Sequence, residues 1–220
     1  MDPGRPRPDL IIFDCDGVLV DSELLSCRCL SEVLAEFDIA LSPQQALELF
    51  LGRSTKAIEQ HYRDLGQIVP DGFLPRLKSQ VLSTFAASLQ PIPGIAGVIS
   101  ELPVPFCVAS SSDLDRVALS LDVTGLRAHF GDRIYTAQMV RHGKPAPDLF
   151  LYAAEQMGAQ PARTLVIEDS ASGVQAGKTA GMTVCGFSGG SHYRGRDGQA
   201  ILSGAGADRV FARMSDFWEA

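Results

Sequence analysis

The 220-residue sequence lacks both the long apolar runs of a membrane protein and the basic excess of a nucleic-acid-binding protein. No stretch approaches the roughly 18 consecutive apolar residues that a transmembrane helix needs. Lys and Arg number 19 against 26 Asp and Glu, so the net charge is −7 and clustered positive charge is scarce. The sequence therefore predicts neither a membrane nor a nucleic acid as a partner, and it leaves the oligomeric state open.

Targeting and disulfide signals are scarce as well. The first eight residues are rich in proline and arginine and hold no apolar segment, so a secretory signal is not expected. The five cysteines, an odd number, are scattered among apolar residues, which favours reduced thiols over a disulfide framework. Cys27 and Cys29 fall in a helical pattern without a second pair to complete a metal site. We expect a cytoplasmic protein.

Short apolar runs alternate with helix-period stretches over most of the chain. The runs that are typical of buried strands cover 10–13, 106–109, 133–135, 164–167, 183–186 and 209–211. Helical patterns between them cover 115–121, 147–157 and 172–180. Because strands alternate with helices, the sequence predicts an α/β fold built on a mainly parallel sheet.

The interval after the first strand differs from the rest. Helical spacing runs from Ser22 to about Gln90 without a convincing strand, with further helices expected over 56–65 and 74–89. Ser42-Pro43-Gln44-Gln45 predicts a capping box with proline at the first helical position. We therefore predict a core domain of residues 1–20 and 91–220, and a helical insertion of residues 21–90 that is able to close over a site.

Two aspartates, Asp14 and Asp16, follow the first buried run, and Gly17 comes next. Because carboxylates are costly in a core without partners, we expect them at the carboxyl end of the strand, where open α/β sheets bind ligands. Gly17 permits a sharp turn and a close approach of a ligand to the backbone. The alternative is a helix cap, although Asp21 and Ser22 already stand at the start of the next helix.

Hydroxyl side chains follow the strand predicted at 106–109. Ser110 and Ser111 come at its end, where hydroxyls and nearby amides are able to hold a phosphate oxygen. Ser112, with Asp115 three residues later, is better interpreted as a helix cap. The sequence thus predicts a polar strand end here that differs in kind from the acidic one after the first strand.

A lysine and a second acidic pair complete the polar signals. Lys144 precedes Pro145, which keeps it in an extended loop and makes it a suitable point charge for a phosphoryl group, although most loop lysines are merely solvated. Glu168 and Asp169 end the run at 164–167. Four carboxylates in one cleft would repel each other, and a divalent cation with oxygen ligands, of which Mg²⁺ fits best, would resolve that repulsion.

Taken in order, these motifs resemble those of the haloacid dehalogenase superfamily. The helical insertion after the first motif is similar to the phosphoglycolate phosphatase/β-phosphoglucomutase-like group, and the closest resemblance is to bacterial sugar-phosphate phosphatases. The resemblance extends from about Asp9 to the end of the chain. It implies a Rossmann-like core with an α-helical cap, and a Mg²⁺-dependent phosphatase of small phosphorylated metabolites, most plainly sugar or sugar-acid phosphates.

The resemblance also implies a role for each motif residue. Asp14 would be the nucleophile that forms an aspartyl-phosphate, and Asp16 the general acid and base. Ser110, Ser111 and Lys144 would bind the phosphoryl group. Dehalogenases of the superfamily need no acid two residues after the nucleophile, so Asp16 favours phosphoryl transfer.

The implied metal site uses the same carboxylates. Mg²⁺ would take Asp14, the backbone carbonyl of Asp16 and Asp169, with Glu168 close by or liganding through a water. No other cofactor is implied by the resemblance.

Substrate specificity rests with the insertion. Arg53, at a helix junction, would contact the non-transferring part of a substrate, although a solvated arginine is an equally good interpretation. β-Phosphoglucomutases typically carry a histidine five residues after the Asp that corresponds to Asp21, and Ser26 stands there in this sequence. This departure favours hydrolysis and leaves a phosphosugar mutase as the alternative.

Overall fold

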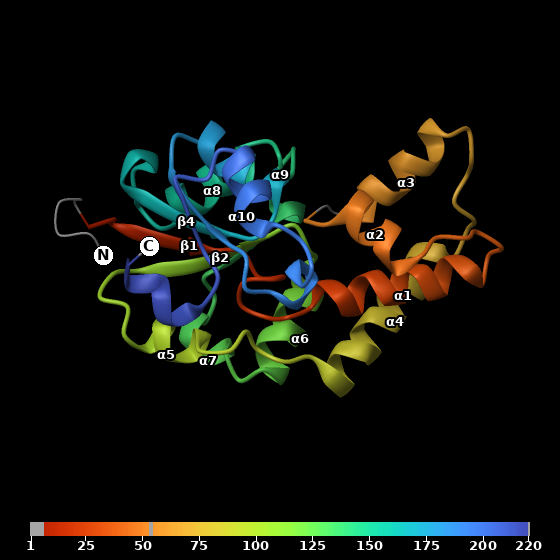
Figure 1. Cartoon of the computed structure of the whole chain (residues 1–220), viewed down its shortest axis with the longest axis horizontal. Coiled ribbons are helices and arrows are strands. Elements are labelled where there is room, and N and C mark those ends of the chain that lie inside the picture. The colour runs from red at the N-terminus through yellow and green to blue at the C-terminus, as the bar shows by residue number, and fades with distance from the viewer. Residues whose placement is uncertain (1–6, 53–54, 220) are drawn as a thin grey trace.

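The structure is a computed structural model that describes residues 7–52 and 55–219. Its centre is a six-stranded sheet in the order β3-β2-β1-β4-β5-β6, and every neighbouring pair is parallel. All six runs predicted as strands form strands, so the predicted α/β, Rossmann-like fold is confirmed (Figure 1). The strands are β1 (Leu10–Phe13), β2 (Phe106–Ser110), β3 (Ile134–Thr136), β4 (Thr164–Glu168), β5 (Thr183–Phe187) and β6 (Arg209–Phe211).

Helices cover both faces of this sheet (Figure 1). Alternate residues of β1 separate the two layers, because Leu10 and Ile12 pack into one apolar cluster and Ile11 and Phe13 into another. The strand is therefore buried on both faces, as its unbroken apolar sequence predicts. One layer holds α8 (Asp148–Gln156), α9 (Ala171–Thr179) and α10 (Gly198–Gly204), and the other holds α5 (Ile95–Ser100), α6 (Leu114–Val123) and α7 (Arg127–Phe130). Short 3₁₀ helices are η1 (Ala137–Met139), η2 (Pro161–Arg163), η3 (Ser191–Tyr193) and η4 (Met214–Glu219).

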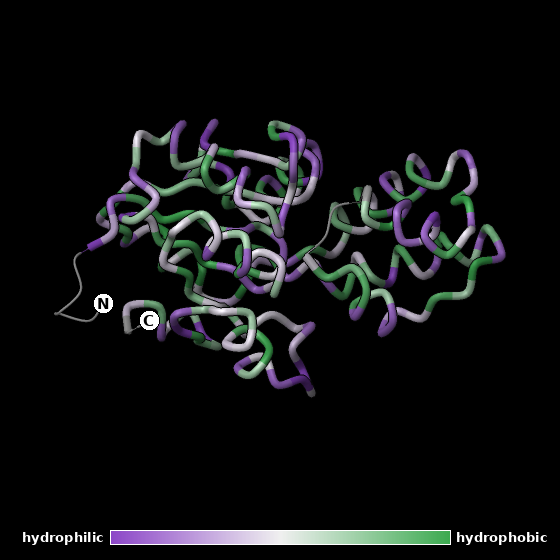
Figure 2. Tube along the Cα trace, turned by 90° about the horizontal axis from the view of Figure 1, so that it is seen from above, coloured by the Kyte–Doolittle hydropathy of each residue, from purple (hydrophilic) through white to green (hydrophobic). Residues whose placement is uncertain are grey.

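A group of four helices lies between β1 and β2 in the chain and stands beside the sheet, away from both chain ends (Figures 1 and 2). They are α1 (Glu23–Ala35), α2 (Pro43–Phe50), α3 (Thr55–Asp64) and α4 (Phe73–Ser88). The predicted capping box is present, since the Ser42 hydroxyl accepts from the Gln45 amide and the Gln45 side chain accepts from the Ser42 amide. The exact domain boundaries stay a prediction. None of the helices in the described part of the chain has the length and apolar character to cross a membrane.

The order of the strands determines where a ligand is expected. The chain passes from β1 to β2 on one side, and β4 pairs with β1 on the other side. The strand order therefore reverses at β1, and open α/β sheets bind ligands at the carboxyl end of such a switch point. The insertion that contains α1 begins directly after this point.

Candidate active site

The polar residues predicted from the sequence gather at the carboxyl ends of β1, β2 and β4. Parallel pairing of Phe13 with Val108 and with Ile167 brings the three strand ends level. The residues that line a single cavity of about 440 Å³ include Asp14, Asp16, Ser110, Ser111, Lys144 and Glu168. Arg53 lies outside the described residues.

Lys144 is the charge that connects the strand ends. Its ammonium group donates to Asp14 Oδ1 at 2.6 Å, to Glu168 Oε1 at 2.7 Å and to the Ala109 carbonyl at 3.1 Å. These three acceptors use all three of its hydrogens, and the Phe150 ring lies 4.7 Å from the nitrogen. Burial opposes its charge, but the two carboxylates outweigh burial and raise the pKa of Lys144. Lys144 therefore carries a positive charge in the interior.

Glu168 has both carboxylate oxygens engaged by the protein. Oε1 accepts from Lys144, and Oε2 accepts from the Ser170 amide at 2.7 Å and from the Ser170 hydroxyl at 3.0 Å. Gly173 is needed beside it, because a Cβ there would lie 1.7 Å from Glu168 Oε1. The structure thus presents Glu168 as a carboxylate that holds Lys144 and the start of α9 in place.

The Asp16 carboxylate is held by three side chains. Oδ1 accepts from the Ser22 hydroxyl at 2.5 Å and from Arg116 Nη2 at 2.6 Å, and Oδ2 accepts from the Ser112 hydroxyl at 2.6 Å. Burial acts to raise the pKa of Asp16, but the charge of Arg116 and the two serine hydroxyls outweigh burial and lower it. Asp16 is therefore fixed in one orientation as a carboxylate.

Two cap interpretations from the sequence are wrong. Ser112 is not a helix cap, because α6 begins one residue later than that interpretation requires and Asp113 accepts from the Arg116 amide instead. Ser22 occupies the position before α1 but makes no capping hydrogen bond, since its hydroxyl points to Asp16. Asp21 accepts from the amide and hydroxyl of Ser191. Hydroxyls that were expected to cap helices thus position a carboxylate.

The two serines predicted to bind phosphate both lie at the cavity. The Ser110 hydroxyl accepts from the Ser112 amide at 3.1 Å, which leaves its own hydrogen to donate. The Ser111 hydroxyl lies 3.4 Å from the carbonyl of Gly52, in the loop between α2 and α3. Ser172 approaches the same carbonyl at 3.3 Å. The loop of the insertion therefore touches the strand ends directly.

The sequence model of the haloacid dehalogenase-like hydrolase family matches residues 11–187. The chain belongs to this family. Among curated proteins it is 35% identical to fructose-1-phosphate phosphatase YqaB of Escherichia coli over 78% of this chain and 92% of that one. It is 28% identical to 6-phosphogluconate phosphatase of Escherichia coli over 86% of each chain.

Solved structures agree with this assignment. A haloacid dehalogenase-like protein of Agrobacterium tumefaciens, ATU0790, superposes with a TM-score of 0.80 at 34% identity over 96% of each chain. A family hydrolase of Deinococcus radiodurans, solved with bound phosphate and sodium, has a TM-score of 0.75 at 34% identity and covers 97% of this chain and 94% of its own. The family resemblance of the motifs is therefore confirmed, and the chain is a hydrolase.

The carboxylates of this haloacid dehalogenase-like hydrolase fit a cation. Among the described residues, Asp14, Glu168 and Asp169 each offer an oxygen within 4.8 Å of the others. Asp169 Oδ2 is buried and accepts no hydrogen bond. Burial and neighbouring carboxylates raise the pKa of Asp14 and of Asp169, with Lys144 opposing them. Such a group of carboxylate oxygens, one of them unpartnered, matches the oxygen ligands that hard divalent cations prefer.

His192 and Gly17 surround the unpartnered oxygen of Asp169. His192 Nε2 lies 3.1 Å from Asp169 Oδ2, but neither ring nitrogen has a partner in hydrogen-bonding geometry. Burial lowers the pKa of His192, so the ring is neutral near pH 7 and forms no ion pair. A Cβ on Gly17 would lie 1.8 Å from the same oxygen, so only glycine fits. Gly17 also has a φ of 77°.

Three residues at the site of the hydrolase were not predicted from the sequence. Arg116 comes from the first turn of α6, a position that gives no sign of contact with Asp16, one hundred residues earlier. Glu23 is a buried carboxyl on the cavity wall, and burial, Asp16 and Asp169 raise its pKa to about 8. His192 was not identified because η3 follows β5, far from every motif.

Proposed function

We propose that this hydrolase releases phosphate from phosphate monoesters of small metabolites through an aspartyl-phosphate on Asp14, with Mg²⁺ bound beside it. The observation that carries the proposal is the pair of carboxylates at one cavity end. Asp14 is held by the Lys144 ammonium, while Asp16, two residues later, is held by Arg116. One carboxylate is thus poised to attack and the other to move a proton.

In the first step, a carboxylate oxygen of Asp14 attacks phosphorus, and the bond from phosphorus to the ester oxygen breaks. Because its lowered pKa keeps Asp16 mostly ionised, Asp16 first takes up a proton from solvent and then gives it to the leaving oxygen, so the alcohol departs neutral. In the second step, Asp16 takes a proton from a water that attacks phosphorus. The bond from phosphorus to the Asp14 oxygen then breaks, which returns the carboxylate and releases phosphate.

The phosphoryl oxygens need positive charge and donors at the same place. Ser110 has a hydroxyl hydrogen to donate, and Lys144 supplies a buried positive charge beside Asp14. Lys144 also neutralises two carboxylates that would repel the phosphate. Ser111, which lines the cavity, completes this proposed phosphoryl site.

As ligands of the cation we assign the carboxylates of Asp14 and Asp169 and the backbone carbonyl of Asp16. When bound, Mg²⁺ would supply positive charge to the transferring phosphoryl group and offset repulsion among the carboxylates. Both oxygens of Glu168 already accept hydrogen bonds within the protein. Glu168 is therefore better suited to contact the cation through a water than to coordinate it directly.

The names of the relatives support a sugar or sugar-acid phosphate as the first class of substrate to test. The curated Escherichia coli proteins described above are named for fructose-1-phosphate and 6-phosphogluconate. The mutase alternative lacks support at Ser26, whose hydroxyl donates to the Ser22 carbonyl and accepts from Arg116. A hydroxyl bound in this way does not replace an imidazole as a proton carrier. Stimulation by glucose-1,6-bisphosphate would identify a mutase.

The test is phosphate release from a panel of phosphorylated metabolites, in Mg²⁺ or in EDTA, for the wild type beside Asp14→Asn. We expect turnover that requires Mg²⁺ and that the variant loses by several orders of magnitude. Turnover that survives in the folded Asp14→Asn variant would contradict the proposal.

A further inference from the structure

The cavity that begins at Asp14 continues into the helical insertion, and its wall changes character there. The first part is polar and includes Asp16, Ser26 and Arg116. Beyond Ser26, the described lining comes from all four helices of the insertion and is almost entirely apolar: Cys27, Leu30, Phe50, Ile58, Leu74, Pro75, Leu77, Val81 and Leu82. We call this second part the apolar arm.

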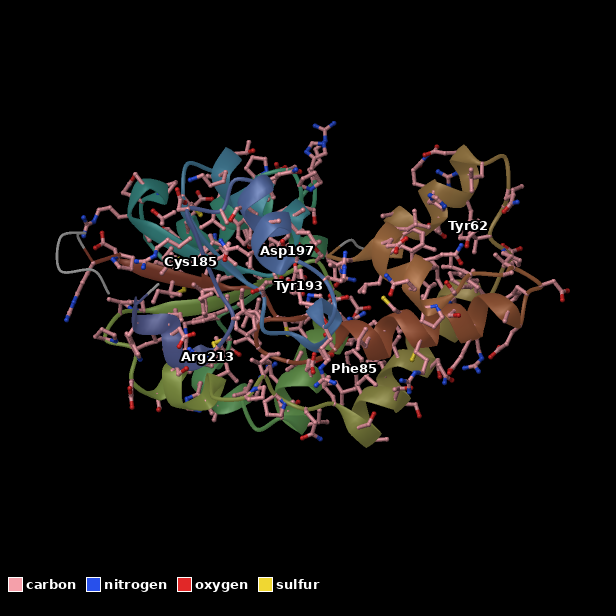
Figure 3. All side chains as sticks on the ribbon, viewed as in Figure 1. Tyr62, Phe85, Cys185, Tyr193, Asp197 and Arg213 are labelled. Carbon is pink, nitrogen blue, oxygen red and sulfur yellow. The ribbon has the colours of Figure 1, made fainter. Side chains whose placement is uncertain are left out.

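The apolar arm lies between faces of α1 and α4. Leu74, Leu77 and Val81 follow one another at three- and four-residue spacing, so they share one face of α4. Leu77, Val81, Phe73 and Phe85 all belong to one packed cluster, but of these four only Leu77 and Val81 line the cavity. Figure 3 shows Phe85 where α4 approaches the sheet domain. The arm is therefore the part of this packed cluster that faces the cavity.

Two polar side chains that border the apolar arm, Ser26 and Lys78, are already bonded within the protein. The Ser26 hydroxyl uses both its hydrogen and an acceptor position, as described above. The Lys78 ammonium donates to Asp115 at 2.6 Å and lies 3.4 Å from Asp113. A polyol placed in the arm would bury hydroxyls without partners, at a cost of ~1–3 kcal/mol each, whereas each buried methylene gains ~0.8 kcal/mol.

We propose that the apolar arm binds the leaving group of the substrate, and that this leaving group is predominantly apolar beyond the carbon atoms next to the ester oxygen. The substrate class is therefore an alkyl or arylalkyl phosphate monoester, which differs from the sugar and sugar-acid phosphates for which the curated relatives are named. The leaving group is the occupant because the arm is continuous with the cavity end that holds Asp14 and Lys144. This inference rests on the proposed phosphatase function.

The test compares esters of primary alcohols, which leave with similar ease. Phosphate release in Mg²⁺ is measured for ethyl, butyl and hexyl phosphate and for glucitol 6-phosphate, the polyol with as many carbons as hexyl phosphate. We expect kcat/KM to rise about fourfold per methylene, the factor that ~0.8 kcal/mol represents. Hexyl phosphate is expected to exceed glucitol 6-phosphate at least tenfold.

A matched pair of variants locates the effect. Val81→Thr keeps the side-chain shape but adds a hydroxyl in the arm, and Ile68→Thr makes a similar change at a residue that is 90% exposed and outside the cavity. We expect Val81→Thr to lower kcat/KM for hexyl phosphate at least threefold more than kcat/KM for ethyl phosphate, and Ile68→Thr to leave the ratio of the two unchanged.

The outcomes separate the two proposals. A flat alkyl series, with glucitol 6-phosphate equal to or better than hexyl phosphate, overturns the apolar arm but keeps the phosphatase. A rising series that Val81→Thr does not weaken places the alkyl chain elsewhere and also overturns the arm. No release from any ester, p-nitrophenyl phosphate included, overturns the phosphatase function itself.

Discussion

Arg116 Nη2 lies 2.6 Å from Asp16 Oδ1, and the same nitrogen lies 2.9 Å from the Ser26 hydroxyl. The guanidinium carbon stands 4.9 Å from the centre of the Phe85 ring. One side chain from α6 of the sheet domain thus contacts the proposed proton donor and two helices of the insertion. The orientation of Asp16 therefore depends on how the insertion packs against the sheet.

Replacing Arg116 is expected to change the pH dependence of the reaction. Arg116 lowers the pKa of Asp16, so Arg116→Met should raise that pKa and shift the Asp16-dependent limbs of the pH–rate profile to higher pH. We expect kcat at the optimum to fall by up to ~10²-fold, because proton transfer loses its orientation. Arg76→Met, on an exposed arginine that pairs with Glu36, is the control. An unshifted profile in Arg116→Met would contradict this role.

Removal of Lys144 is expected to destabilise the fold as well as stop turnover. Lys144→Gln leaves Asp14 and Glu168 as adjacent buried carboxylates, so the free energy of unfolding in EDTA should fall by about 3 kcal/mol or more. Mg²⁺ should recover part of this loss. Lys178→Gln, which removes a half-exposed pair with Asp208, should cost less than ~1 kcal/mol. Urea unfolding measures both, and equal losses would contradict the role of Lys144.

Gly17 offers a test of the metal site that does not depend on activity. Gly17→Ala puts a Cβ onto Asp169 Oδ2, whereas Gly66→Ala imposes a similar positive φ with no atom within 4 Å. Both changes should lower the free energy of unfolding by ~1–2 kcal/mol, because they hold an alanine at a positive φ. Only Gly17→Ala should also weaken Mg²⁺ binding, at least tenfold by calorimetric titration. Mg²⁺ affinity that is unaltered in Gly17→Ala would exclude Asp169 Oδ2 as a ligand.

The raised pKa of Glu23 predicts that the free energy of unfolding depends on pH. Its pKa is raised to about 8 in the folded chain, and an unfolded glutamate ionises near ~4.3. The folded state binds more protons between these values, so stability falls as pH rises through that window. Glu23→Gln removes this term. In EDTA, the free energy of unfolding of the variant minus that of the wild type should be larger at pH 9 than at pH 5, by more than ~1 kcal/mol. If this difference is the same at both pH values, the pKa of Glu23 is not raised.

The sequence was informative wherever local pattern determines structure. Buried runs such as 10–13 formed strands at the predicted places, because a short β-branched run has few alternatives to a central strand. Residues at strand ends, including Asp14, Ser110 and Glu168, could be placed together from the sequence, because parallel strands of one sheet share a carboxyl edge.

The sequence was less informative wherever a contact depends on packing. Ser112 and Ser22 have the residue type of helix caps, and a one-residue difference in where α6 begins decides that Ser112 bonds Asp16. Arg116 comes one hundred residues after Asp16 and reaches it only through the tertiary packing of the sheet domain. The apolar arm combines residues of four helices whose relative placement no local pattern specifies.

The most direct test of the aspartyl-phosphate mechanism uses Asp16→Asn with p-nitrophenyl phosphate in Mg²⁺. Nitrophenolate leaves without a proton, so the first step should proceed, while the second step lacks its base. We expect a burst of about one nitrophenolate per enzyme and a phosphate on the peptide that contains Asp14, both absent from the Asp14→Asn and Asp16→Asn double variant. Steady turnover without a burst, and without phosphate on Asp14, would contradict an aspartyl-phosphate on Asp14.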